Sequence, residues 1–160
     1  VENADAGLYA GQQVILTPIE RTLAARTDQA EALWRALGCD VVRMSPESHD
    51  AAFAAVSHLP HLIAFALMNS IAAQPDGATF MSLAGPGFRD FSRIAASDPQ
   101  VWRDVLIANR AEVGTQIEHF QQALTALRQL IDSGQSDALE RLINRASHAR
   151  AHWRRAPGAR

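Results

Sequence analysis

The sequence has little of what marks several large classes of protein. Its 160 residues include a single cysteine, Cys39, so no disulfide can form within the chain, and a reducing compartment is expected. The most continuous apolar run, residues 62–68, is far shorter than the roughly 20 residues of a membrane span. The net charge of −2 gives no overall attraction to nucleic acid. We therefore expect a cytoplasmic protein whose partners include neither a membrane nor a nucleic acid.

Three further features of the sequence concern possible phosphate binding and the extent of the chain. No Gly-x-Gly-x-x-Gly motif is present, because the Gly85-Pro86-Gly87 turn lacks a third glycine and a preceding strand. Basic residues crowd the C-terminal stretch from Arg141 to Arg160, which is interpreted as a solvated helix face rather than a phosphate-binding tail. The chain begins with Val1 rather than Met, which fits a piece of a larger protein, although a processed or engineered start would look the same.

What is present begins with a short α/β pattern. Residues 13–17 and 40–44 are β-branched runs typical of strands. Between them, Asp28 and Glu31 form a capping-box-like helix start, and Gly38 ends the helix. Strand, helix and strand at this spacing predict a βαβ crossover with parallel strands. Two strands are too few to be stable alone, so residues 1–44 are predicted to be the remnant of a sheet that lies mostly upstream.

From Ser45 onward the pattern is helical. Ser45-Pro46-Glu47 is a strong helix start, and this helix is predicted to run to about Ala73 with a kink at Pro60. Short helical pieces and a turn at residues 85–87 follow, and then a brief helix over residues 88–96. Asp98-Pro99 begins a predicted helix of more than thirty residues that Gly134 ends, and Ser136 is predicted to cap a last helix.

The fold class is therefore predicted to be mainly α, with one very long helix after the βαβ remnant. A helix of more than thirty residues spans roughly 50 Å, whereas a compact domain of this size has a radius of gyration of about 15 Å. Such a helix needs apolar contacts from a second copy of the chain, so we expect a homodimer. The predicted domains are the remnant at 1–44, the helical dimerisation domain at 45–155 and a tail at 156–160.

Several polar side chains on the first long helix could carry chemistry. His58 and His61 share roughly one face, and a His-x-x-His pair on a helix could bind metal. No third ligand at a defined spacing completes such a site, so hydrogen-bonded core or interface histidines are the favoured interpretation and no metal is predicted. Ser57 beside His61 also lacks the oxyanion loop that a nucleophile needs.

The stretch from Gly85 to Arg93 is more informative. A glycine turn that opens a helix can point backbone N–H groups at an anion, and Arg89 and Arg93 lie one helical turn apart. The alternative is an ion pair between Asp90 and Arg93, with Arg89 solvated. Trp102, at the start of the long helix, could be a packing residue or could close a pocket.

These segments together resemble the prephenate dehydrogenase family. The matching stretches include Val14 to Pro18, Ser45 to Asp50, Ser57 to His61 continuing into Ala64 to Leu67, and Gly87 to Ala95. Ser97-Asp98-Pro99 and Trp102-Arg103-Asp104 follow in the same order. Each motif is weak alone, but six in register over most of residues 14–109 make a specific resemblance.

The resemblance implies an oxidoreductase that converts prephenate, or arogenate, with loss of CO2 on the route to tyrosine. In this family an N-terminal Rossmann domain binds NAD or NADP and carries the catalytic histidine, and a helical C-terminal domain forms the dimer and completes the substrate pocket. The histidine motif and the glycine loop of that Rossmann domain are absent here. The chain is therefore expected to contain no catalytic residue and no cofactor site, and to be inactive alone.

The site residues implied by the resemblance are assigned position by position. His61 matches a substrate-contacting histidine, and Arg93 matches an arginine that binds a substrate carboxylate, which suits the bidentate guanidinium. Gly85 and Gly87 match a turn whose backbone lines the pocket, although Pro86 removes one donor. Trp102 matches a residue reaching toward the neighbouring subunit's pocket. His49 and Asp50 match a pair near the mouth of the site, with a gating or structural role.

Two other hypotheses remain at this point. The chain could be a stand-alone helical dimerisation or metal-binding module, with metal at His58 and His61. It could also be a regulatory remnant of the same family that has lost its enzymatic function.

Overall fold

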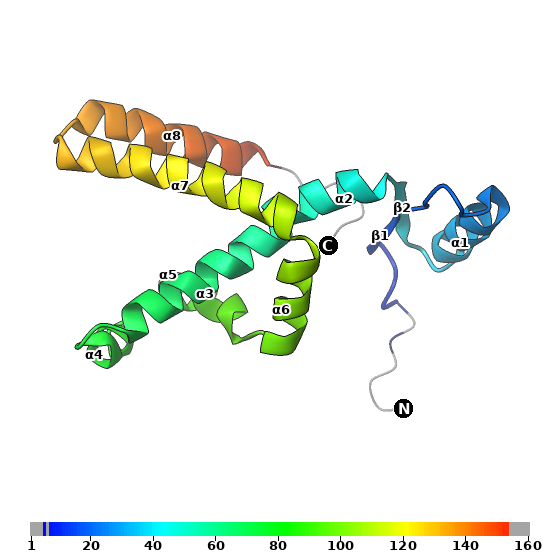
Figure 1. Cartoon of the computed structure of the whole chain (residues 1–160), viewed down its shortest axis with the longest axis horizontal. Coiled ribbons are helices and arrows are strands. Elements are labelled where there is room, and N and C mark those ends of the chain that lie inside the picture. The colour runs from blue at the N-terminus through cyan, green and yellow to red at the C-terminus, as the bar shows by residue number, and fades with distance from the viewer. Residues whose placement is uncertain (1–4, 6, 154–160) are drawn as a thin grey trace. The chain divides into compact units, whose positions relative to one another are not determined.

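The computed structural model describes Asp5 and residues 7–153, and these residues are mainly helical, as predicted (Figure 1). The chain divides into two compact units, one formed by residues 1–49 with 125–160 and the other by residues 50–124. The predicted boundaries at residues 44/45 and 155/156 lie where the sequence pattern changes, whereas the two units are defined by contacts between residues. The predicted boundaries therefore stay a prediction.

The N-terminal α/β pattern is confirmed. Strand β1 (Gln13–Leu16) pairs in parallel with β2 (Asp40–Arg43), and helix α1 (Ala24–Ala36) is the crossover between them. Gln13 lies opposite Asp40 at one end of the ladder, and Leu16 lies opposite Arg43 at the other. Gly38 ends the crossover with a φ of 86°, in the left-handed region that favours glycine.

The predicted capping box at Asp28 and Glu31 is wrong. Helix α1 begins earlier, at Ala24, and its N-cap Leu23 makes no side-chain cap hydrogen bond. Both carboxylates lie inside the helix and bind Arg43 at the end of β2, where the Arg43–Asp28 ion pair measures 2.8 Å. Arg35, one turn beyond Glu31, binds the same glutamate at 2.7 Å. The acidic residues therefore fasten the helix to the strand instead of starting the helix.

This charge cluster has a testable consequence. Hydrogen bonds from Arg35 and then Arg43 lower the pKa of Glu31 below its ordinary value of 4.5. The stability that the ionised Glu31 contributes is therefore present above pH 4.5 and is lost as the pH falls through the lowered pKa. We expect an NMR titration of the Glu31 carboxyl carbon to show this lowered pKa, and Arg35→Gln to raise it more than Arg43→Gln does. A wild-type value at or above 4.5 contradicts the prediction.

The first long helix runs continuously from Pro46 to Ala72. It consists of α2 (Pro46–Phe53), the π-helical turn η1 (Ala54–His58) and α3 (Leu59–Ala72). Ser45 begins it as predicted, because its Oγ accepts a hydrogen bond from the Ser48 N–H at 3.1 Å. The irregularity expected at Pro60 takes the form of the π turn just before it, where the Leu59 N–H bonds to the carbonyl of Ala54.

This helix is more apolar than its short uninterrupted run suggested. Its best 18-residue window has a mean hydropathy of 1.6, so by length and composition the helix could cross a membrane. The same test is passed by core helices of soluble proteins, and a single such helix is weak evidence for a membrane. Only 17% of that window is buried within the chain. Most of its apolar surface is therefore left for something else to cover.

Three short helices follow and pack against α3. They are α4 (Gly77–Ser82), α5 (Pro86–Ser92) and the 3-10 turn η2 (Arg93–Ala96). Helix α5 begins two residues earlier than the predicted start at Phe88, with Gly85 as its N-cap and Pro86 at the first helical position. The segment from Gly85 to Ala96 is thereby held along the helix that carries His61.

The predicted single helix of more than thirty residues is wrong. It is two helices, α6 (Pro99–Ala108) and α7 (Arg110–Asp132), which meet at Asn109. Asn109 leaves the helical conformation, with φ −104° and ψ 28°, and its side-chain amide bonds to the first long helix. Asp98 caps α6 as predicted, accepting hydrogen bonds from the N–H groups of Gln100 and Val101. At 23 residues α7 is still a long helix.

The C-terminal hairpin completes the described chain. Gly134 ends α7 with a φ of 66°, as predicted, and α8 (Ser136–His152) runs back antiparallel beside the C-terminal part of α7 (Figure 1). The predicted cap at Ser136 is wrong, because Gln135 holds the N-cap position and Ser136 is already helical. The predicted tail at 156–160 lies outside the described residues.

Candidate functional site

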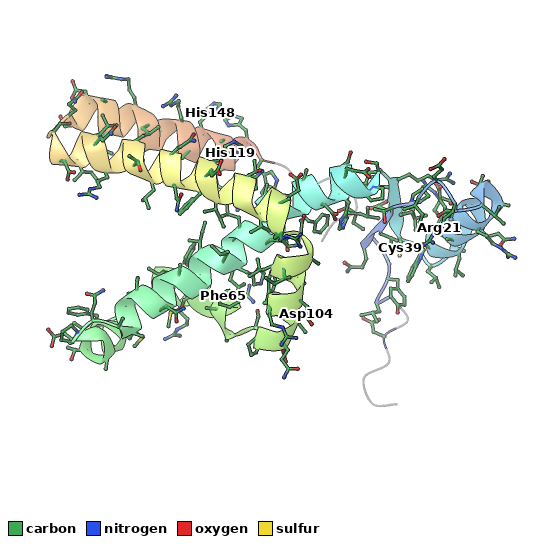
Figure 2. The ribbon with its side chains drawn as sticks, in the orientation of Figure 1. Arg21, Cys39, Phe65, Asp104, His119 and His148 are labelled. Atoms are coloured by element: carbon green, nitrogen blue, oxygen red, sulfur yellow. The ribbon has the colours of Figure 1, made fainter. Side chains whose placement is uncertain are left out.

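A cluster of four rings joins the first long helix to α6. The imidazole of His61 stacks on the indole of Trp102, with ring centroids 3.6 Å apart and an interplanar angle of 20°. His58 and Phe65 contact the same indole in T-shaped arrangements, with centroids 6.3 Å and 6.2 Å away. Figure 2 shows Phe65 on the side of α3 that faces α6. Trp102 is thus a packing residue, and the face of its indole supports the imidazole of His61.

One hydrogen bond determines which nitrogen of the neutral His61 ring carries the proton. Its Nδ1 lies 2.9 Å from the carbonyl oxygen of Ser57, one turn earlier in the π-helical segment. A carbonyl oxygen only accepts, so Nδ1 carries the proton, and in the neutral ring Nε2 keeps a free lone pair. The stacking on Trp102 and this bond together fix the ring plane. His61 is therefore held by two contacts that leave Nε2 available to a ligand.

His58 is held in the opposite tautomer. The amide Nδ2 of Asn109 donates to Nδ1 of His58 at 3.2 Å and to the backbone oxygen of Asp50 at 2.8 Å. Because Nδ1 of His58 accepts, the proton of its neutral ring is on Nε2. Asn109 falls at a position where the helical periodicity of residues 102–131 favours an apolar residue, and this mismatch is the signal in the sequence of a different role.

The metal hypothesis for His58 and His61 gains no third ligand. In both imidazoles Nδ1 is engaged in a hydrogen bond, to Asn109 and to Ser57 respectively. Within residues 5 and 7–153, no group of three His, Cys, Asp or Glu side chains is arranged to hold a metal ion. Structural and catalytic zinc sites use at least three protein ligands.

Arg93 is carried by η2, which packs against α3, the helix of His61. Its side chain is exposed, as is that of Arg89 in the turn before it. The alternative ion pair between Asp90 and Arg93 is not formed, and no carboxylate in the described part of the chain pairs with Arg93. An arginine in this state keeps all its donors for an anionic ligand.

Gly85 and Gly87 are exposed and have no conformational need to be glycine. Neither has a positive φ, and a Cβ built on either would meet nothing within 4 Å. The space beside them is open, and because glycine has no side chain, another molecule can approach the backbone more closely there than at any other residue. Their role in lining a pocket stays a prediction.

The remaining pair lies on α2. His49 is half-buried and Asp50 is exposed, and the backbone oxygen of Asp50 receives the Asn109 amide. The structure thus brings Asp50, His58, His61 and Trp102 together through Asn109 and the ring cluster. The gating role of His49 and Asp50 stays a prediction.

The opposite tautomers of the two histidines can be measured. We expect two-bond 15N–1H NMR spectra of the neutral rings to show Nδ1–H for His61 and Nε2–H for His58, because one ring donates to a carbonyl and the other accepts from an amide. Asn109→Ala should remove the preference of His58 and leave His61 unchanged, which makes His61 the internal control. Nε2–H at His61, or a His58 tautomer insensitive to Asn109→Ala, contradicts the described contacts.

Comparison with known proteins places this geometry among relatives. Residues 45–145 match the family model described as the dimerization domain of prephenate dehydrogenase. The chain is 33% identical to a cyclohexadienyl dehydrogenase of Zymomonas mobilis, over 91% of this chain and 52% of the relative. The chain therefore spans about half the length of this curated relative.

Solved structures give the same result. A prephenate dehydrogenase of Aquifex aeolicus, in complex with hydroxyphenyl propionate and NAD+, superposes with a TM-score of 0.85 and 38% identity, covering 94% of this chain and 53% of that one. An arogenate dehydrogenase of Synechocystis superposes with a TM-score of 0.81 and 28% identity, covering 91% and 53%. The likeness includes the N-terminal βαβ segment, since nearly the whole chain is aligned in each case.

Proposed function

Because this chain belongs to the prephenate dehydrogenase family, with its helical part matching that family's dimerization domain, we propose that it forms the helical half of an NAD- or NADP-dependent prephenate dehydrogenase. The proposed reaction is oxidative decarboxylation of prephenate to 4-hydroxyphenylpyruvate. Arogenate, which carries an amine where prephenate has a keto group, is the second candidate substrate, since a structural neighbour is an arogenate dehydrogenase.

The observation that carries the proposal is the orientation of His61. Its ring is fixed between Trp102 and the Ser57 carbonyl, and its Nε2 is left free on a helix against which the Arg93 segment packs. To bind a small dicarboxylate ring compound, a pocket needs a side chain that hydrogen-bonds the polar substituents of the ring. It also needs a permanent cation that pairs with a carboxylate. The neighbour that superposes over 94% of this chain binds hydroxyphenyl propionate, an aromatic carboxylate.

In this proposal the residues of the chain bind and orient the substrate. Arg93 pairs with a carboxylate through its planar donors, and His61 hydrogen-bonds the substrate through Nε2. The nicotinamide, when bound, accepts the hydride that leaves the substrate ring as CO2 departs. No residue described here is proposed to bind the nucleotide, so the chemistry requires a nucleotide-binding domain in addition to this chain.

The same proposal includes a homodimer in a reducing cytoplasm. Large apolar side chains remain exposed on the first long helix, on α6 and on α7, among them Val56 at 73%, Ile107 at 61% and Leu124 at 54%. Among the described residues, no large side chain is fully buried. A second copy would cover such surface by the hydrophobic effect. The thiol of Cys39 is buried and forms no disulfide, which suits a reducing compartment.

The role of Arg93 is tested by Arg93→Ala in a protein that joins this chain to its nucleotide-binding domain. Loss of charge-assisted hydrogen bonds worth about 1.5–3 kcal/mol should raise KM for prephenate by roughly 10–100-fold. Steady-state kinetics with NAD measure this directly. Arg103→Ala is the matched control, because Arg103 is exposed and pairs with Asp104 at 2.8 Å. A KM for Arg93→Ala within twofold of wild type removes Arg93 from the site.

The dimer is tested by light scattering after gel filtration, with an expected mass of about twice 17.4 kDa. Leu124→Glu should give monomers, because an unpaired charge buried at an interface costs several kcal/mol. Gln122→Glu adds the same charge to another exposed position of α7 and should leave the dimer intact. A wild-type monomer, or a protein recovered only in detergent, speaks against the dimer.

A further inference from the structure

A second pair of histidines lies on the last turns of α8. His148 and His152 are one helical turn apart, and their rings stack with centroids 3.9 Å apart and an interplanar angle of 26°. Both side chains are exposed, and Figure 2 shows His148 on α8. They follow the part of the chain that matches the family model, which ends at residue 145. The pair is not among the residues proposed above to bind the substrate.

The ring nitrogens of this pair are available to a ligand. Nδ1 of His152 lies 2.8 Å from the backbone oxygen of His148, so it donates, and Nε2 of the neutral His152 ring keeps its lone pair. In the described part of the chain, no hydrogen bond or ion pair engages the ring of His148. Each ring thus offers at least one nitrogen lone pair on the same face of one helix.

We propose that His148 and His152 form a two-imidazole surface site, completed by water, for a divalent transition metal ion of the Ni2+ or Cu2+ class; two protein ligands are too few for the structural or catalytic zinc sites considered above. Histidines at positions i and i+4 of a helix are the spacing by which zinc-binding helices present two ligands to one ion. Imidazole suits these ions and not Mg2+ or Ca2+, which require oxygen ligands. To bind one ion at the usual bond length of about 2.0–2.1 Å, the two rings must turn out of their stacked arrangement.

The surroundings of the pair set how the ion is held. Its position in the last turn of α8 places the ion at the negative end of the helix dipole, which favours a cation. Arg150 lies on the same turn and opposes the ion, although its guanidinium is over the face of Trp153, 5.1 Å from the ring centroid. Water completes the coordination, because the described residues place no third His, Cys, Asp or Glu beside the pair. Binding should therefore be weaker than at a three-histidine site.

The experiment is calorimetric titration of the tag-free chain with Ni2+ at pH 7.5, with Mg2+ as the oxygen-seeking control. We expect no more than one Ni2+ per chain, no heat with Mg2+, and at least tenfold weaker Ni2+ binding in His148→Ala and in His152→Ala. His119→Ala is the matched control, because His119 is an exposed histidine on α7 without a histidine one turn away. Circular dichroism checks that each exposed substitution leaves the helices intact.

A rescue variant separates a metal site from general loss of histidine. Asn144→His combined with His152→Ala moves the pair one turn toward the start of α8, since Asn144 is exposed and four residues before His148. This variant should recover Ni2+ binding to within about threefold of wild type if spacing on one helix face is what matters. Binding that survives His148→Ala and His152→Ala but is lost in His58→Ala or His61→Ala would overturn the proposal, as would an absence of Ni2+ binding by the wild type.

Discussion

The side-chain amide of Asn109 is the contact on which the candidate site depends. It donates to the backbone of Asp50 and to the ring of His58, which lie 59 and 51 residues earlier in the chain. It thereby fastens the corner between α6 and α7 to the first long helix. Trp102 lies on α6, and its indole stacks on His61. Without this corner a continuous helix would carry Trp102 along a different path.

The π-helical turn at Ala54–His58 is the second local constraint. Proline at position 60 has no N–H to give to a regular α-helix, and the turn before it is widened. The carbonyl of Ser57 in that turn accepts from His61, which sets the tautomer of the ring. Helix irregularities of this kind often occur at functional sites. Here the π turn supplies the acceptor that sets the tautomer of His61, whereas the Asn109 amide sets the opposite tautomer of His58.

The apolar surface left uncovered by the chain connects fold and function. The most apolar 18-residue window of the first long helix has a mean hydropathy of 1.6 and is only 17% buried, which is unusual for a domain that is stable alone. In the proposed enzyme a second copy covers part of it, and the site is completed where the chains meet. The exposed state of Arg93, Gly85 and Gly87 fits the same picture, because each faces space that a substrate or partner can fill.

The sequence by itself determined the element types, the parallel strand pair, the helix starts at Ser45 and Asp98, and the family. These depend on residue types at neighbouring positions, such as a hydroxyl or carboxylate before proline. Tertiary structure alone decided the break at Asn109, the use of Asp28 and Glu31 in binding Arg43, and the stacking of His61 on Trp102. In each of these cases a side chain binds a partner on another element, and periodicity within a segment carries no information about that partner.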